Sequence, residues 1–334
     1  MPIVTELLDA FPIDETVCQL QRDEELLLTK PEAKAMPGGV KMWQDHDLLL
    51  AYTFPTKYVP SKFALPRGVF ESEHVHIEWQ KMNFRQPFYH RNVDVDEIGY
   101  HISGERTLIT EKGSVDLQVG DFARIPVGVA HDNRGVEDVH LIFYIPAPVS
   151  ECITPSRKAE FKMPPFPGWE GKAVVEMMTD CLGSVHCDVS VSLADERKLL
   201  EAAISDPEPL TVLRATDSAE TEWIYKSPLV WLGSTTLSKT NGRVYKRHRR
   251  ADEMQYQVKG RRTLVTQRGT LELEAGDFVN IPLGCAFTEI VHGDSTHLSV
   301  LSRWPAPPKQ EGSKVAVETT MELVAKLRKE IHEG

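Results

Sequence analysis

Residues 90–104 read His-Arg-Asn-Val-Asp-Val-Asp-Glu-Ile-Gly-Tyr-His-Ile-Ser-Gly, and the chain returns to this pattern at residues 246–260. The second version reads Lys-Arg-His-Arg-Arg-Ala-Asp-Glu-Met-Gln-Tyr-Gln-Val-Lys-Gly. The same offset of 156 residues relates three later motifs: Thr107-Leu-Ile-Thr and Thr263-Leu-Val-Thr, Gly120-Asp-Phe and Gly276-Asp-Phe, Ile125-Pro-Val-Gly and Ile281-Pro-Leu-Gly. A register that holds without a gap through all of them indicates two copies of one structural unit.

The two copies differ at the side chains that could bind a metal. His90 and His131 of the first copy correspond to Lys246 and Phe287 of the second. A phenylalanine has no ligand atom, and the ligands left in the second copy are too few to hold an exchangeable metal. Any metal chemistry is therefore predicted for the N-terminal half.

The composition describes a soluble globular protein. Its 334 residues, 41% hydrophobic and 26% charged, suffice for two domains. The net charge of −11 argues against nucleic acid or an anionic membrane as a partner, because both require clustered Lys and Arg. The sequence shows no signal peptide, no apolar run as long as a membrane span, and no disulfide framework among its five Cys. We therefore expect a cytoplasmic protein.

Short apolar runs separated by turn residues fill residues 47–148 and return at about 223–307. Many short strands at regular spacing predict antiparallel barrels, so the expected fold class is all-β with two tandem barrels. Residues 1–40 are expected to form a helical or irregular arm, and residues 172–204 a partly helical insert between the barrels. We place the domain boundary between residues 155 and 156.

The end of the chain has a different pattern. Helical spacing relates Val317, Met321, Val324, Leu327 and Ile331. This amphipathic stripe predicts a C-terminal helix that packs against the body of the protein or against a second subunit.

The spacing of residues in the first copy points to a known superfamily. His90, Asn92, Glu97 and Gly104 match the pattern His, one residue, His, four residues, Glu, six residues, Gly, with Asn92 in the place of the second His. A second pattern, Gly, five residues, Pro, one residue, Gly, two residues, His, ends at His131. Both patterns resemble the motifs of the cupin superfamily, which consists of jelly-roll barrels. The resemblance implies a bicupin: a metal-binding N-terminal domain (1–155), then an insert, a degenerate cupin domain and a helix (156–334).

The strand pattern is consistent with one site inside the first barrel. Residues 90 and 92 share a strand face, because side chains alternate with a period of two. Glu97 and His101 share the inward face of the next strand, and His131 returns from a distant one. Two imidazoles and one carboxylate form the facial arrangement of non-haem Fe(II) oxygenases, with Mn, Zn or Ni as alternative metals. Asn92 would add a ligand oxygen or hydrogen-bond the substrate, and His101 would serve in acid/base chemistry or as a core histidine.

A narrower resemblance concerns Phe84-Arg-Gln-Pro-Phe-Tyr-His-Arg-Asn92, which is similar to the iron-binding segment of homogentisate dioxygenases. Gentisate dioxygenases are related two-cupin proteins. The resemblance implies an oxidoreductase that uses Fe(II) and dioxygen to cleave a hydroxylated aromatic ring, with a homodimer as the expected assembly. Arg106 and Arg124 are candidates for binding a substrate carboxylate.

Two other function classes remain open on the same residues. One is a lyase, isomerase or decarboxylase that uses the metal without oxygen chemistry. The other is a metal-free bicupin that binds a small molecule.

Overall fold

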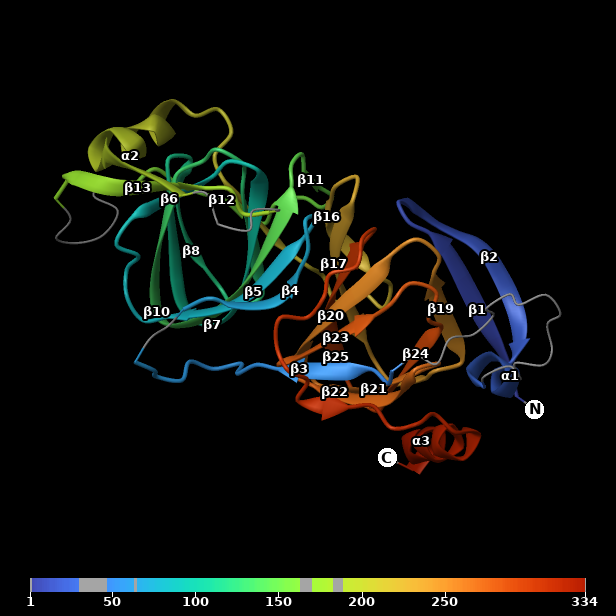
Figure 1. Ribbon diagram of the computed structural model, residues 1–334. Helices are drawn as coiled ribbons and strands as arrows, with labels where there is room; N and C mark the ends of the chain where they lie inside the picture. Colours follow the sequence, from blue (N-terminus) through green and yellow to red (C-terminus); the bar gives the residue numbers. More distant parts are fainter. Residues whose placement is uncertain (1, 30–46, 63–64, 163–169, 183–188, 334) are drawn as a thin grey trace.

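The computed structural model describes residues 2–29, 47–62, 65–162, 170–182 and 189–333 of the chain. Strands predominate in this part, and they form two barrels that lie side by side (Figure 1). A C-terminal helix, α3 (Met321–Glu333), packs against the second barrel. The expected all-β architecture of two tandem cupin barrels with a terminal helix is confirmed. Within the described residues, no helix is both long and apolar enough to span a bilayer.

The first barrel is a single sheet of 11 strands. Its members are β4 (Arg67–Glu71), β5 (His76–Met82), β6 (Tyr89–Asn92), β7 (Val95–Thr110), β8 (Gly113–Leu117), β9 (Asp121–Ile125), β10 (His131–Pro146), β12 (Arg157–Lys158), β13 (Ala173–Thr179), β14 (Val189–Asp195) and β15 (Thr211–Arg214). Strands β7 and β10 have 16 residues each and pair along most of their length, so they connect the two layers of the barrel.

The second barrel divides into a sheet of seven strands and a sheet of eight. The seven are β1 (Ile3–Ala10), β2 (Ile13–Asp23), β18 (Thr240–Asn241), β19 (Val244–His248), β21 (Arg261–Thr266), β22 (Gly269–Glu274) and β24 (Phe287–Val291). The eight are β3 (Leu50–Thr53), β11 (Ser150–Glu151), β16 (Glu222–Lys226), β17 (Val230–Leu237), β20 (Asp252–Lys259), β23 (Asp277–Ile281), β25 (Ser295–Ser302) and β26 (Lys314–Val315).

The glycine that ends the first repeated motif has a steric reason in both copies. Gly104 and Gly260 have φ angles of 85° and 73°, a region that other residues rarely adopt. A Cβ atom would lie 2.2 Å from the carbonyl oxygen of Glu137 at Gly104, and 2.1 Å from that of Asp294 at Gly260. Glycine is therefore required for the bend of the chain at both positions.

Each barrel is completed by a segment that precedes the other copy in the sequence. Strand β1 pairs in parallel with β19 of the second barrel, and β3 pairs with β23 there. In the first barrel, β13 pairs in parallel with β6, and β15 pairs with β9. The boundary between residues 155 and 156 remains a proposal, but the hydrogen-bonded sheets cross it in both directions (Figure 1).

The exchanged segments are themselves related. Each is a strand hairpin followed by a short helix: α1 (Glu24–Leu28) after β2, and α2 (Glu196–Ser205) after β14. Asp23 and Asp195 cap these helices by accepting hydrogen bonds from backbone N–H groups of the first turn. The duplication therefore includes the hairpins, although their spacing in the sequence differs from that of the barrels.

The residue that follows each cap is a buried glutamate, which holds the helix against the barrel that its hairpin completes. Glu24 accepts a hydrogen bond of 2.7 Å from the hydroxyl of Tyr245, and Glu196 accepts one of 3.0 Å from Tyr89. An arginine adds an ion pair in each case, Arg328 to Glu24 at 2.6 Å and Arg85 to Glu196 at 2.5 Å.

Two expectations from the sequence require correction, whereas the partly helical insert is confirmed, with a helix at residues 196–205 after strands at residues 173–179 and 189–195. The described residues 3–23 form a hairpin and not a helical or irregular arm. Val317 precedes the C-terminal helix and forms a bridge to Thr270. Short apolar runs with β-branched residues leave helix and strand undecided until a partner strand is known.

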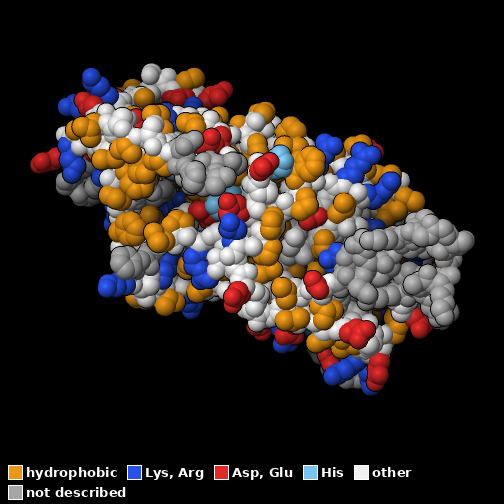
Figure 2. Space-filling view, in the orientation of Figure 1, with side chains coloured by type: hydrophobic (Ala, Val, Ile, Leu, Met, Phe, Trp, Pro, Cys, Tyr) orange, Lys and Arg blue, Asp and Glu red, His pale blue; other side chains and the backbone are white. Residues whose placement is uncertain are grey.

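The hairpin of the first barrel presents apolar side chains to solvent. Val191 and Leu193 of β14 are 64% and 76% exposed. Hydrophobic side chains gather at this end of the molecule in Figure 2. Between the barrels, by contrast, the apolar side chains of both copies form one buried core, which includes Ile98 and Phe122 of the first copy and Met254 and Phe278 of the second.

Candidate metal centre

Three side chains of the first barrel converge from three strands. His90 lies on β6, Glu97 on β7 and His131 on β10, and β10 pairs with both of the other strands. Their ligand atoms all lie within 4.8 Å of one another. The two imidazole rings have centroids 5.2 Å apart, and Nε2 of His131 lies 3.2 Å from Oε2 of Glu97. The structure therefore brings together the three residues that the sequence motifs single out.

The site is buried enough to control the ionisation of its members. Burial lowers the pKa of His90 to about 4, and the nearby His131 adds to this effect, so the ring is neutral at pH 7. Burial alone would raise the pKa of Glu97, but His131, His90 and the amide of Asn92 hold it well below its usual range. The same carboxylate raises the pKa of His131 against the opposing effect of burial.

The orientation of His131 leaves one ring nitrogen for a metal. Its Nδ1 lies 3.2 Å from the carbonyl oxygen of Val129, to which it donates in the tautomer that leaves Nε2 as the ligand atom. A neutral imidazole at His90, an ionised Glu97 and an oriented His131 fit a divalent transition metal.

Asn92 lies inside the barrel and is engaged by the protein itself. Its side-chain Nδ2 donates a hydrogen bond of 3.0 Å to Oε2 of Glu97. Its Oδ1 accepts one of 3.1 Å from the thiol of Cys181, which belongs to the insert. Cys181 is a site residue that the sequence did not reveal, because the insert and the strand lie 89 positions apart. Its sequence neighbours His186 and Cys187 lie outside the described residues.

Tyr144 and Glu78 also face this interior, although the sequence motifs did not identify them. Tyr144 is the cross-strand partner of Glu97, and its hydroxyl donates a hydrogen bond of 3.3 Å to Oε2 of Glu78. Burial raises the pKa of Glu78. Strand parity could have suggested Tyr144, but only the pairing register shows which residue of β10 stands opposite Glu97.

His101 is directed to the far end of the same interior. Its Nε2 lies 3.0 Å from the carbonyl oxygen of Ser103 and 3.4 Å from Asp138. Burial lowers the pKa of His101. The opposite residue, His140, is buried and lies 2.7 Å from Asp138 through Nδ1.

The two candidate arginines occupy different faces of the sheet. Arg106 is buried inside the barrel, and both its Nε and its Nη2 donate to Oδ1 of Asn133, at 3.2 and 2.8 Å. Arg124 stands opposite Ile98 and therefore lies on the face turned away from Glu97. It forms ion pairs with Asp96 at 2.9 Å and with Glu151 at 3.5 Å.

The second barrel replaces the metal ligands with a different arrangement. Phe287 fills the position of His131 and is almost fully buried. His248 occupies the position of Asn92, and its Nε2 lies 2.5 Å from Oε2 of Glu253. Within the described residues, His90, Glu97 and His131 are the group of ligands that could hold a metal, and the second barrel provides no equivalent group.

Comparisons with known proteins show distant similarity of structure. No family model matches the chain, and no curated protein matches it in sequence. A cupin 2 conserved barrel domain protein from Leptotrichia buccalis aligns with a TM-score of 0.45 and 10% identity, over 77% of this chain and 98% of its own. A point mutant of Bacillus subtilis oxalate decarboxylase aligns with a TM-score of 0.47 and 13% identity, over 78% of each chain. AerE from Microcystis aeruginosa aligns with a TM-score of 0.41 and 11% identity, over 72% of this chain and 98% of its own.

At such low similarity these alignments carry no argument about chemistry. The tandem cupin architecture follows from the duplicated motifs and from the order of the strands in the two barrels. The sequence and the geometry of the first barrel together give a candidate metal centre in one of the two copies.

Proposed function

We propose that the chain is a non-haem Fe(II)-dependent dioxygenase that cleaves a hydroxylated aromatic ring. The observation that carries the proposal is the convergence of His90, Glu97 and His131, two imidazoles and one carboxylate, in a buried site. This donor set is the one typical of iron oxygenases that leave adjacent coordination positions for substrate and dioxygen. The resemblance of residues 84–92 to homogentisate dioxygenases supports the substrate class.

The three ligands would hold the metal in place without further proton transfer at His90 or Glu97. His90 is neutral and Glu97 is ionised at pH 7, so neither has to lose a proton when a metal binds. Bound Fe(II) would supply Lewis acidity toward a phenolate and one-electron chemistry toward dioxygen.

Other residues of the interior would prepare the site for this chemistry. The hydrogen bond from Asn92 to Oε2 orients the carboxylate of Glu97, which would keep it in position to bind the metal. Tyr144 and Glu78 form a buried hydrogen-bonded pair beside Glu97. With its raised pKa, Glu78 can accept the proton that a phenolic substrate releases, through the hydroxyl of Tyr144.

Strand β6 forms the end of the dioxygenase-like segment, residues 84–92, and its side chains point to two different faces. His90 and Asn92 face the interior, whereas Tyr89 and Arg91 bind the insert, Tyr89 through Glu196 and Arg91 through an ion pair of 2.6 Å with Glu176. Alternate residues of this strand therefore have different roles. One face would bind the metal, and the other holds the insert against the first barrel.

The test is purification without oxygen, followed by elemental analysis and oxygen uptake. We expect one iron per chain and oxygen consumption with a panel of dihydroxylated aromatic compounds, both abolished in His131→Ala. The matched control is His248→Gln in the second barrel, which should retain both. Turnover of an aromatic substrate under strict anaerobic conditions would instead support a lyase, isomerase or decarboxylase. Absence of bound metal would overturn both metal-dependent functions.

A further inference from the structure

The second barrel has a cavity of its own, which none of the three metal ligands lines. Its volume is about 350 Å³, within the range of about 300–1,000 Å³ that is usual for small-molecule sites. The hairpin β1–β2 forms one side, and β16, β17, β19 and β25 form the other. Two carboxylates, Glu15 and Glu220, are exposed at its rim. The cavity therefore lies where the N-terminal hairpin meets the barrel that it completes.

Part of the cavity wall is aromatic. The ring of Trp231 has its centroid 5.0 Å from that of Phe11 and 5.3 Å from that of Trp223, in edge-to-face arrangements. At the offset of 156 residues, the first copy has Val75 in the place of Trp231 and Arg67 in the place of Trp223. The aromatic wall is therefore a feature of the second copy, and it suits an aromatic or large aliphatic group.

Two groups of opposite charge line this cavity without complete partners. The ammonium group of Lys246 forms no hydrogen bond or ion pair among the residues that the structure describes. Asp9 contacts Nδ1 of His248 through Oδ2, but its Oδ1 is buried and accepts no hydrogen bond from the described part of the chain. Unpaired buried polar atoms cost free energy, so a ligand that pairs with both groups would be bound favourably.

The two groups do not pair with each other, because they lie apart on neighbouring strands. Leu7 stands opposite Lys246 in the parallel pairing of β1 with β19, and Asp9 follows two residues later. From the spacing of paired strands and the rise along a strand, the Cα atoms of Asp9 and Lys246 are roughly 8 Å apart. A small molecule that carries a cation and an anion close together can therefore contact both.

The first barrel lacks both of these charged groups. His90 takes the position of Lys246 in the repeat. The pairing register of the two hairpins places Thr179 where the second barrel has Asp9. The charges of the second cavity are therefore not left over from a metal site but form a separate arrangement.

The charges around the cavity are balanced. Burial would lower the pKa of His248, but Glu253 and Asp9 raise it to about 9, so the ring is a cation at pH 7. Together with Lys246, it offsets the carboxylates of Asp9 and Glu253. A ligand with a net charge would upset this balance in a partly desolvated site, whereas a zwitterion would not.

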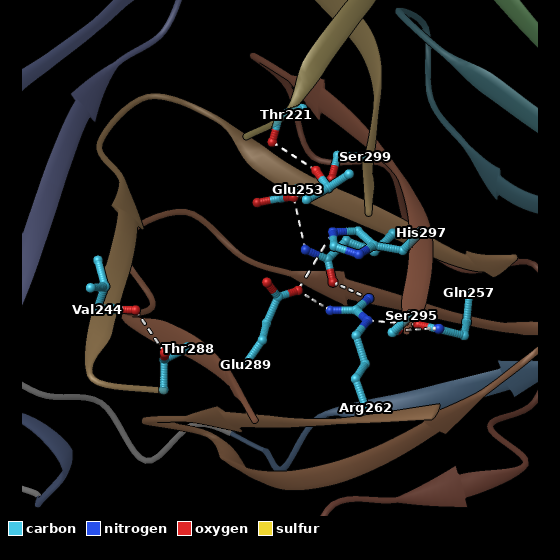
Figure 3. A network of polar contacts seen from close by, with 12 residues as sticks. Thr221, Val244, Glu253, Gln257, Arg262, Thr288, Glu289, Ser295, His297 and Ser299 are labelled. Atoms are coloured by element: carbon cyan, nitrogen blue, oxygen red, sulfur yellow. Dashed lines mark hydrogen bonds and ion pairs between the residues drawn. The ribbon is translucent and has the colours of Figure 1, made fainter. Parts of the chain in front are cut away.

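The barrel interior behind the cavity is satisfied by the side chains of the protein. Arg262 donates through Nε to Gln257 at 2.6 Å and through Nη2 to Gln255 at 2.7 Å. Its Nη1 forms an ion pair with Glu289 (Figure 3). Every branch of this guanidinium has a partner, so the unpaired groups available to a ligand are those beside the hairpin.

We propose that the cavity of the second barrel binds a free amino acid with an aromatic or large aliphatic side chain. The ammonium group would donate to Oδ1 of Asp9, and the carboxylate would pair with Lys246. The side chain would pack against Trp223 and Trp231. Because this ligand would contact both the hairpin and the barrel, its binding would hold the hairpin in place. The site is independent of the metal centre and of the reaction proposed there.

The experiment compares three probes by calorimetry on the full chain. They are L-phenylalanine, 3-phenylpropanoate, which lacks the ammonium group, and 2-phenylethylamine, which lacks the carboxylate. We expect L-phenylalanine to bind about 10- to 100-fold more tightly than either analogue, which is the range for a hydrogen bond to a charged group. An analogue that binds as tightly as L-phenylalanine, or no binding of any probe at millimolar concentration, would overturn the proposal.

Two variants assign the two charged groups of the ligand. Lys246→Met should reduce the advantage of L-phenylalanine over 2-phenylethylamine below about threefold without weakening the binding of that amine. Asp9→Asn should reduce the advantage over 3-phenylpropanoate in the same way. The control, Lys259→Met, alters an exposed lysine of β20 and should leave all three affinities unchanged. Full retention of the preference in Lys246→Met would contradict the proposal.

Two further measurements place the ligand. The His131→Ala variant should bind L-phenylalanine as the unmodified protein does; loss of binding would put the amino acid at the metal centre and reject the proposed site. Hydrogen exchange in β1 and β2 should slow when L-phenylalanine is added, whereas exchange in β13 and β14 should not change. Unchanged exchange in β1 and β2 would overturn the proposal even if the Asp9 and Lys246 variants do not fold.

Discussion

Asn92 donates a hydrogen bond to the same oxygen of Glu97, Oε2, that lies 3.2 Å from His131. In the second barrel, His248 takes this position and contacts Oε2 of Glu253 at 2.5 Å. The residue at this position therefore orients the glutamate in both copies. Asn92 stands where the cupin motif has a histidine. Its amide replaces the imidazole as the group that holds the carboxylate of Glu97 in place.

Substitution of Asn92 by Ala should weaken metal binding without abolishing it. Glu97 would lose the hydrogen bond that fixes its orientation, and the loss of such an outer partner typically reduces metal affinity by about 10- to 100-fold. Competition with a chelator of known affinity measures the change. Glu97→Ala should be far more damaging; equal losses in the two variants would indicate that Asn92 is itself a ligand.

The second barrel should gain a metal ion when the missing ligands are restored. In the double variant Lys246→His and Phe287→His, these two residues and Glu253 would reproduce the donor set of the first barrel, with His248 nearby. We expect the metal content to rise from one toward two per chain by elemental analysis. The single variant Lys246→His is the control and should stay at one, because Phe287 still fills the third position.

The stability of the second barrel should decrease at alkaline pH. Burial alone would lower the pKa of His248, but Glu253 and Asp9 raise it to about 9. A raised pKa in the folded state contributes stability that is complete below the ordinary value of about 6.5 and is lost as the pH rises through about 9. The loss should be on the order of 3 kcal/mol at most, measured by urea unfolding at pH 6, 7.5 and 9.

Two variants separate this effect from a general alkaline loss of stability. His248→Gln cannot titrate and should unfold with little change of free energy over the same range. Asp9→Asn keeps the histidine but removes one of its carboxylates, so its loss should be smaller and should be complete at a lower pH. A decline of equal size in His248→Gln would show that another group is responsible.

The insert should detach from the first barrel when Glu196 is replaced. Glu196→Ala removes the acceptor of the hydrogen bond from the Tyr89 hydroxyl and one of the two ion-pair partners of Arg85. The other ion pair of Arg85, with Asp132 at 2.5 Å, remains. Since Arg85 is partly exposed, we expect a loss of roughly 2 kcal/mol, less than for a fully buried pair. Hydrogen exchange should speed up in β13 and β14 and remain slow in the second barrel. The control Arg197→Ala breaks an exposed ion pair with Glu201 and should change the stability by less than about 0.5 kcal/mol.

The residues of the candidate metal centre could be read from the sequence because they are tied to turns with strict local requirements. The glycine at position 104 adopts a backbone conformation with φ of 85°, and its spacing from Glu97 is set by the strand between them. Such constraints act over a few residues, so they leave a local pattern. His90 and His131 could be added because they stand at fixed distances from the same turns.

The interior partners could not be read in this way. Tyr144, Cys181 and Asn133 reach their neighbours across strands or from the insert, and no local spacing records these contacts. Arg106 could be placed on a strand from the sequence, but the acceptor of its hydrogen bonds could not be foreseen, because it lies on another strand.

The sequence by itself determined the duplication, the barrel type and the three ligands that only one copy retains. Periodicity and turn glycines act locally, and a repeat makes them visible twice. Only the tertiary structure decided which segment completes which barrel: the β1–β2 hairpin joins the second copy, and β13–β14 joins the first. It also decided which buried charges have partners. These outcomes depend on pairing between distant strands, where the free energy comes from burial and hydrogen bonds that no local pattern encodes.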